Sequence, residues 1–246
     1  MKVKSVLVTQ PKPENDKSPY FDLADKYKLK VDFRPFIHVE GLEAQEFRQN
    51  RINIADYSAI ILTSRNAVDH FFRLCAELRV KVSDDLKYFC FSEATAYYLQ
   101  KYVVFRKRKI FFGRLTIHDL IEQIVKHKDN KFLVPCSDIL KPSIPDVLTK
   151  NKIDFTTASF YKTVCSDLQD LSDVNYDVLV FFSPADIKSL YQNFPDFKQN
   201  NTRIACFGPT TIKAAEAAGL EVNIKAPMPK LPSMTMAIQD YIENNK

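Results

Sequence analysis

Short apolar segments alternate with helical patterns along almost the whole chain of 246 residues. This alternation is typical of βα units, in which each strand leads into a helix that packs back on a parallel sheet. The expected helices carry apolar residues at three- and four-residue steps, as at Val68, Phe71 and Cys75, or at Leu120 and Ile124. The expected strands are 6–9, 59–62, 88–91, 103–105, 131–134, 153–156, 178–182, 203–207 and 221–224. The sequence therefore predicts an α/β fold built on parallel sheets.

Two blocks of sequence recur at nearly the same spacing. The segment YSAIILTS at 57–64 matches YDVLVFFS at 176–183, an offset of 119 residues from Ser64 to Ser183. The segment CFSEAT at 90–95 matches CFGPTT at 206–211, an offset of 116 residues from Cys90 to Cys206. Two separate blocks with similar offsets indicate an internal duplication. We therefore expect two similar α/β lobes.

Several helix ends are also marked in the sequence. Ser183, Pro184 and Asp186 have the residue types of an N-cap, a first helical position and a capping-box acid. A helix that begins after Gly208-Pro209 is expected to end at Gly219. The last helix is expected to follow the proline-rich loop 227–232 and to begin at the N-cap Ser233.

Composition excludes several classes of protein. Hydrophobic residues make up 46% of the chain and charged residues 26%, which is typical of a folded globular protein. No apolar run approaches the ~18 residues of a membrane span, and no signal-peptide core follows the N-terminus, so we expect no membrane partner. The four glycines lie far apart, at 41, 113, 208 and 219, which excludes glycine-rich dinucleotide and P-loop sites.

Metal and disulfide chemistry are also not expected. The four histidines show no HxxxH spacing, and the five cysteines form no CxxC pair. The cysteines mostly lie in apolar stretches, as buried reduced thiols of a cytoplasmic protein do.

The formal net charge of +5 permits an acidic partner, and the densest basic run is Arg106–Lys109. We interpret this run as a solvated turn between extended segments at 102–105 and 110–112. Nucleic-acid binding is a remote alternative, because no recognition motif accompanies the run.

The loops that follow four expected strands are small and rich in hydroxyl groups. They are 63–66, 91–95, 182–184 and 208–211. Ligands of parallel α/β sheets bind at the carboxyl ends of the strands, where backbone N–H groups and the helix dipole favour anions. Serine and threonine at such positions also serve simply as N-caps, and this alternative stays open for each loop. Four related loops in two lobes favour a cleft that holds a large polyanion.

These motifs resemble one known family. VLVTQP at 6–11, ILTSRNAV at 61–68, YKT at 161–163, FFSP at 181–184 and FGPTT at 207–211 occur in the order found in uroporphyrinogen-III synthases. The chain departs from the family pattern at Gln10, where arginine is frequent, and at Ser92, where glycine is frequent. The resemblance implies two α/β lobes joined by a two-stranded crossing, with a cleft between them. The first lobe would comprise residues 1–36 and 165–246, and the second residues 37–164. The extended segments 34–39 and 159–164 would form the crossing.

The resemblance also implies an activity. Family members act without a cofactor on the small molecule hydroxymethylbilane, a linear tetrapyrrole that carries acetate and propionate groups. Loss of the terminal hydroxyl gives an azafulvene, and attack by the substituted carbon of the last pyrrole gives a spiro intermediate. Rearrangement inverts that ring before closure to uroporphyrinogen III. Nothing in the sequence requires more than a monomer.

Site residues follow from the same resemblance. Tyr161 is the candidate proton donor, with simple packing of the crossing as the alternative. The candidate carboxylate-binding residues are Thr63, Ser64, Arg65, Ser92, Ser183, Thr210 and Thr211. A non-catalytic two-lobed binder or sensor of an acidic metabolite would share these features and is the alternative function.

Overall fold

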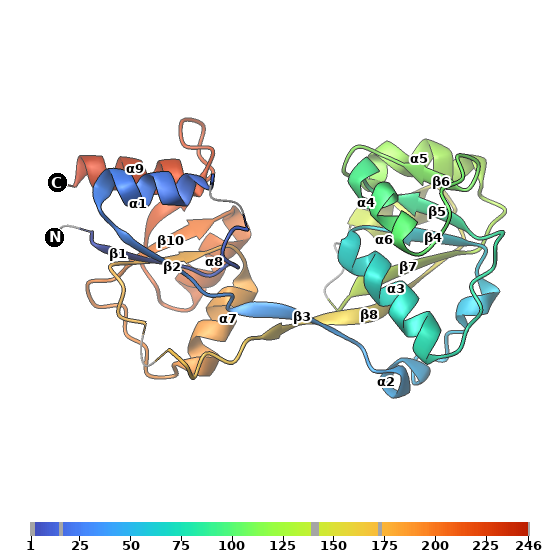
Figure 1. Cartoon of the computed structure of the whole chain (residues 1–246), viewed down its shortest axis with the longest axis horizontal. Coiled ribbons are helices and arrows are strands. Elements are labelled where there is room, and N and C mark those ends of the chain that lie inside the picture. Colours follow the sequence, from blue (N-terminus) through green and yellow to red (C-terminus); the bar gives the residue numbers. More distant parts are fainter. Residues whose placement is uncertain (1–2, 15–16, 139–142, 172–173, 246) are drawn as a thin grey trace. The chain divides into compact units, whose positions relative to one another are not determined.

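The computed structural model describes residues 3–14, 17–138, 143–171 and 174–245. The chain divides into two compact units. Unit 1 comprises Met1–His38 and Val164–Lys246, and unit 2 comprises Val39–Thr163. Each unit contains a sheet with helices on both faces (Figure 1). The chain is thus α/β in both units, as the alternation of apolar and helical patterns predicts.

Unit 1 is built on a five-stranded parallel sheet with the strand order β11-β10-β9-β1-β2. Its strands are β1 (Ser5–Val8), β2 (Lys30–Phe33), β9 (Val178–Phe181), β10 (Arg203–Phe207) and β11 (Val222–Ala226). Its helices are α1 (Pro19–Tyr27), α7 (Pro184–Asn193), α8 (Pro209–Ala217) and α9 (Met234–Asn244). Strand β1 lies between β9 and β2, so both ends of the chain contribute to one sheet.

Both faces of this sheet are buried. Val6 and Val8 of β1 share a core with Ile238 of α9, whereas Leu7 of β1 shares another with Leu190 of α7. Figure 1 shows α1 and α9 on one side of the sheet and α7 on the other. Two-sided burial explains why β1 and β9 are continuous apolar runs and do not alternate with polar residues.

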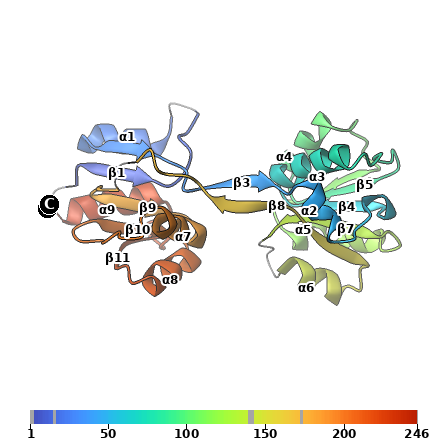
Figure 2. The same cartoon turned by 90° about the horizontal axis from the view of Figure 1, so that it is seen from below.

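Unit 2 contains a six-stranded sheet with the order β3-β8-β7-β4-β5-β6, in which β8 to β6 are parallel. Its strands are β3 (Ile37–Gly41), β4 (Ala59–Leu62), β5 (Lys87–Cys90), β6 (Ile110–Phe112), β7 (Phe132–Ser137) and β8 (Phe155–Cys165). Its helices are α2 (Ala44–Arg48), α3 (Arg65–Glu77), α4 (Glu93–Tyr98), α5 (Ile117–Lys126) and α6 (Ser143–Lys150), with 3-10 turns η1 (Ile54–Asp56) and η2 (Leu99–Lys101). Strands β3 and β8 run in opposite directions (Figure 2) and carry the chain out of unit 1 and back.

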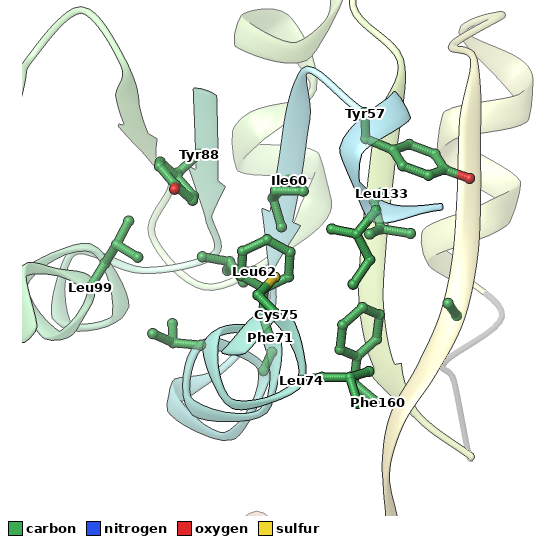
Figure 3. Packing of buried hydrophobic residues seen from close by; sticks show 14 of the residues in the cluster. Tyr57, Ile60, Leu62, Phe71, Leu74, Cys75, Tyr88, Leu99, Leu133 and Phe160 are labelled. Carbon is green, nitrogen blue, oxygen red and sulfur yellow. The ribbon is translucent and has the colours of Figure 1, made fainter. Parts of the chain in front are cut away.

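The core of unit 2 also has two layers. On one face, Phe71 of α3 packs against Phe160 of β8 with ring centroids 6.0 Å apart, beside Ile60 and Leu62 of β4 (Figure 3). On the other face, Ile61 of β4 belongs to a separate cluster with residues of α5 and α6. This arrangement holds α3, and the loop that leads into it, firmly against the sheet.

The two units share one topology, which confirms the duplication. Strands β8-β7-β4-β5-β6 of unit 2 correspond in order to β2-β1-β9-β10-β11 of unit 1. The helices that follow β4 and β9 begin at matching serines, Ser64 and Ser183. Unit 1 is a permuted copy, because its first two strands stand at the start of the chain and its other three at the end.

The predicted caps are confirmed. Ser183 is the N-cap of α7 with Pro184 at the first helical position, and Asp186 completes a capping box. Helix α8 is followed by Gly219, whose φ of +81° suits glycine. The second half of the predicted strand 153–156 and the whole predicted crossing segment 159–164 belong to one long strand, β8, which begins at Phe155.

The predicted strand at 103–105 is wrong. These residues lie between η2 and a turn at 107–109, and strand β6 at Ile110–Phe112 occupies the edge position beside β5. Val103 and Phe105 pack on the core of unit 2, whereas Val104 is 77% exposed. The basic run does form a turn, and Lys109 pairs with Asp85 at 2.9 Å. Only its later flank is a strand.

Candidate functional site

A pocket of about 550 Å³ lies at the carboxyl ends of strands β4, β5 and β7 in unit 2. Hydroxyl groups, a thiol and an imidazole share its wall with apolar side chains. Its described lining residues are Thr63, Ser64, Phe91, Leu115, Thr116, Ile117, His118, Cys136, Ser137, Ser143, Ile144 and Tyr161. Ligands of parallel sheets bind at this edge, and the volume is typical of a small-molecule site.

Thr63 and Ser64 reach the pocket because β4 ends at Leu62 and α3 begins immediately after them. The Ser64 hydroxyl accepts the Ala67 N–H at 3.2 Å as the N-cap of α3. A hydroxyl that accepts one hydrogen bond still has a proton to donate. Ser64 can therefore cap the helix and direct its proton either to the Tyr161 phenol or to a bound carboxylate.

Tyr161 is placed in the pocket by β8. Tyr161 is 8% exposed, so most of its side chain is packed, and it lines the pocket. Burial raises the pKa of the phenol above its ordinary value, and hydrogen bonding by the Ser64 and Thr63 side chains acts in the opposite direction. The phenol is therefore protonated at neutral pH and can donate a proton.

The helix starts differ in how much they attract an anion. Helices α3 and α8 have no acidic residue in their first turns, whereas α4 carries Glu93 and α7 carries Asp186. In α7, the Asp186 carboxylate accepts the N–H groups of Phe182 and Ser183, both at 2.9 Å. Those N–H groups are occupied by this chain's own carboxylate. The starts of α3 and α8 are thus better anion receptors than those of α4 and α7.

The remaining predicted residues of unit 2 lie near this pocket but not in its described lining. Arg65 is exposed at the first position of α3, with its guanidinium 5.4 Å from the centroid of the Tyr98 ring. Ser92 caps α4 by accepting the Thr95 N–H at 3.2 Å, and Phe91 lines the pocket at that point. The structure thus brings together Thr63, Ser64 and Tyr161.

In unit 1, the predicted residues stand at two helix starts. The Ser183 hydroxyl accepts the Asp186 N–H at 3.3 Å as a cap, and Thr210 is exposed on the first turn of α8. Thr211 is only 1% exposed, and its hydroxyl has no partner among the described residues. Its side chain faces the core and does not reach a ligand in this conformation, because the helix turns it toward the sheet.

Four residues that line the pocket carry a hydroxyl or imidazole group and were not predicted: Thr116, His118, Ser137 and Ser143. Thr116 and His118 belong to the start of α5, which follows β6, a strand that the apolar pattern did not assign separately. Their signal was the capping pair Thr116 and Asp119, which marks a helix start. In the part of the chain that the structure describes, no group of three or more His, Cys, Asp or Glu side chains could hold a metal ion.

The family was tested by comparison with known proteins. A family model described as Uroporphyrinogen-III synthase HemD matches residues 20–236. The chain belongs to this family. The match extends across both units, so the family includes the whole two-unit arrangement of elements and not one unit alone.

Solved structures of uroporphyrinogen-III synthases share the fold of this family member. The synthetase from Helicobacter pylori is 16% identical, with a TM-score of 0.61 over 98% of this chain and 100% of that chain. A mutant synthase from the extremely thermophilic bacterium Thermus thermophilus is 13% identical, with a TM-score of 0.53 over 98% of this chain and 100% of that chain. No curated protein sequence matches the chain significantly. Among the described helices, none is both long and apolar enough to cross a membrane.

Proposed function

We propose that this protein is a uroporphyrinogen-III synthase, a lyase that cyclises hydroxymethylbilane to uroporphyrinogen III. The observation that carries the proposal is the family match over residues 20–236. A protonated phenol at the wall of a hydroxyl-lined pocket supports it, because the reaction needs a proton donor and receptors for carboxylates. The residues quoted in the resemblance include this phenol and the pocket hydroxyls at 63 and 64.

The first step is loss of the terminal hydroxyl. The nitrogen of the adjoining pyrrole supplies the electron pair, the C–O bond breaks, and the Tyr161 phenol transfers its proton so that water leaves. The product of this step is the azafulvene. A general acid at this position contributes typically 10²–10⁴-fold to a rate. Tyr161 can do this because burial keeps its proton in place at neutral pH.

The second step decides which isomer forms. The substituted carbon of the last pyrrole attacks the azafulvene to give a spiro intermediate. The bond from that carbon to its original methylene bridge then breaks, and the methylene bonds to the free carbon of the same pyrrole, so that this ring is inverted on closure. The proton lost when the last pyrrole becomes aromatic restores the phenol, so the balance is one substrate to one product and water. The protein contributes geometry, since it holds the chain in a pose that favours attack at the substituted carbon.

Carboxylates of the substrate are bound at the carboxyl ends of both sheets. In unit 2, Thr63, Ser64 and Arg65 at the start of α3 are the main receptors, with Ser92 beside them. In unit 1, Thr210 at the start of α8 is the main receptor and Ser183 contributes its hydroxyl. This ranking rests on the acids in the first turns of α4 and α7. Thr211 contributes only as part of the first turn of α8, because its side chain is buried.

We further propose that residues 1–36 with 165–246, and residues 37–164, act as the two lobes of the enzyme. The protein acts as a monomer in the cytoplasm and without a cofactor. The cytoplasm is a reducing compartment in which cysteines stay as thiols, and Cys75, Cys90, Cys136 and Cys206 are buried free thiols, which supports this location.

The experiment that tests the activity is separation of product isomers. Purified protein is incubated with freshly prepared hydroxymethylbilane, and the uroporphyrins formed after oxidation are separated by chromatography. We expect type III product at a rate proportional to protein concentration. Type I product alone, at the rate of a protein-free control, would leave only the non-catalytic binder of an acidic metabolite.

A further inference from the structure

The Tyr161 ring has a flat neighbour on α3. The imidazole of His70 stacks on the phenol with ring centroids 5.1 Å apart and an interplanar angle of 24°. His70 is half-buried and does not belong to the described lining of the pocket. Its contact is therefore with the proposed proton donor and not with the cavity. Such a stack restricts the angles that the phenol ring can adopt.

His70 is itself held by Arg73. The Arg73 Nε donates to His70 Nδ1 at 3.3 Å. The same guanidinium donates from Nη2 to the carbonyl oxygens of Leu42, at 2.7 Å, and Phe160, at 3.4 Å, and it pairs with Glu77. Phe160 immediately precedes Tyr161 on β8. One side chain thus joins the imidazole to the strand that carries the phenol.

The chain leaves space for this guanidinium at Gly41. A Cβ on Gly41 would lie 2.5 to 2.6 Å from the Nη2, Cζ and Nε atoms of Arg73. The close approach of Arg73, and not a positive φ, favours glycine at this position. The atoms in the way are the end of a flexible side chain, so a methyl group would move Arg73 and leave the backbone in place.

The hydrogen bond from Arg73 also defines the form of the imidazole. Because Nδ1 accepts, the ring proton is on Nε2. Burial and the positive charge of Arg73 lower the pKa of His70, and the Asp69 carboxylate acts weakly in the opposite direction. The ring is neutral at neutral pH. A neutral ring leaves the phenol protonated, whereas an imidazolium in contact would favour the phenolate.

We propose that His70, held by Arg73, is a positioning residue that fixes the orientation of the Tyr161 phenol for proton transfer. This inference rests on the proposed function, in which Tyr161 is the donor. Hydrogen bonds and packing behind a catalytic group keep it in the productive geometry, and small misplacements cost a large part of the rate.

The two contacts of His70 can be separated by substitution. His70→Asn keeps an acceptor near the position of Nδ1 and loses the ring, whereas His70→Phe keeps a ring and loses the acceptor. Gly41→Ala displaces the Arg73 side chain and leaves the His70 side chain itself unchanged. The matched control is His127→Ala in the same unit, because His127 is also half-buried and packs on Phe89 and Phe111 at the other end of the sheet.

Steady-state kinetics with hydroxymethylbilane give the first result. We expect His70→Asn to lower kcat about 10-fold with KM changed less than about two-fold, since a positioning residue acts on the reacting geometry and not on binding. Gly41→Ala and His70→Phe should lower kcat by smaller factors, and His127→Ala should leave it unchanged. In a Tyr161→Phe background, His70→Asn should have no further effect on kcat. A kcat loss of the same size with and without the Tyr161 hydroxyl would overturn the proposal, as would a wild-type kcat in His70→Asn.

A spectroscopic readout does not depend on activity. In protein labelled with [¹³Cζ]tyrosine, the Tyr161 signal is identified by its loss in Tyr161→Phe. We expect this signal to shift in His70→Asn and Gly41→Ala, and to stay in place in His127→Ala. An unchanged Tyr161 signal in both test variants would show that His70 does not position the phenol. If the shift occurs but the wild-type protein makes no type III product, the contact stands and the proposed function fails.

Discussion

At the scale of single residues, the proposed activity depends on the hydroxyl group of Tyr161. Tyr161 is 8% exposed, and the pKa of its phenol is raised by burial more than neighbouring hydroxyls lower it. The same side chain could serve as simple packing, because it belongs to the buried core of unit 2 and stacks on His70. Removal of the hydroxyl alone distinguishes these roles, since it leaves the packed ring in place.

Tyr161→Phe is expected to lower kcat about 10²-fold, the lower end of the contribution of a general acid. KM and the thermal midpoint should stay close to the wild-type values, because the ring and its stack with His70 remain. Initial rates of type III formation and a circular dichroism melt measure both quantities. A variant that turns over at the wild-type rate would assign Tyr161 to packing.

At the scale of elements, two capping carboxylates in different surroundings can be compared. Asp186 at the start of α7 is 2% exposed, and accepts the N–H groups of Phe182 and Ser183 at 2.9 Å. Asp119 at the start of α5 accepts the N–H groups of Leu115 and Thr116 at 3.0 and 2.8 Å, but it is exposed. The two carboxylates thus accept the same pattern of hydrogen bonds, but only Asp186 is buried.

Asp186→Ala is expected to lower the free energy of unfolding by about 1–3 kcal/mol, because two part-buried N–H groups lose their partner. Asp119→Ala should cost less, since water can replace its carboxylate. Urea unfolding, followed by circular dichroism with both variants side by side, gives the two values. Equal losses would contradict the role assigned to burial.

The same scale shows what the sequence can predict about the fold. The strands β4 and β10 were predicted at their observed bounds, because buried apolar residues fill all of β4 and the middle of β10. Strand β2, Lys30–Phe33, was not predicted. It is an edge strand with no fully buried residue, and its pairing with β1 is set by tertiary contacts. The segment 103–105 was apolar enough to be a strand but had no neighbour to pair with.

The site was predictable only in part. Hydroxyls that follow strands, such as Ser64 and Ser183, were found because caps have a local sequence signature. Two outcomes could not be predicted: Thr211 is buried on the inner side of α8, and Thr116 and His118 line the pocket. Both depend on how a helix is rotated about its axis and on which strands are neighbours. His70 gave no signal of its own, because its contact with Tyr161 joins residues far apart in the chain.

At the scale of the molecule, each unit has its own core. All buried residues of the two clusters in unit 2 come from residues 42–161, and those of the two clusters in unit 1 from residues 3–36 and 168–238. Unit 2 is continuous in sequence and unit 1 is not. We expect a fragment of residues 37–165 to fold alone, because it retains β3, β8 and both of its core layers. Cooperative urea unfolding of the fragment, with native-like circular dichroism, checks this, and a gradual non-cooperative change would contradict it.

Our central proposal is that carboxylates of the substrate are bound at the carboxyl ends of the parallel strands in each unit. Hydrogen–deuterium exchange of the whole chain, measured with and without uroporphyrinogen III under anaerobic conditions, tests this claim most directly. We expect slower exchange at the helix starts 63–67 and 116–118 of unit 2 and at 208–212 of unit 1. We expect no change at 82–86 and 199–203, which lie at the opposite ends of the sheets. Slower exchange confined to one unit, or to those opposite ends, would contradict it.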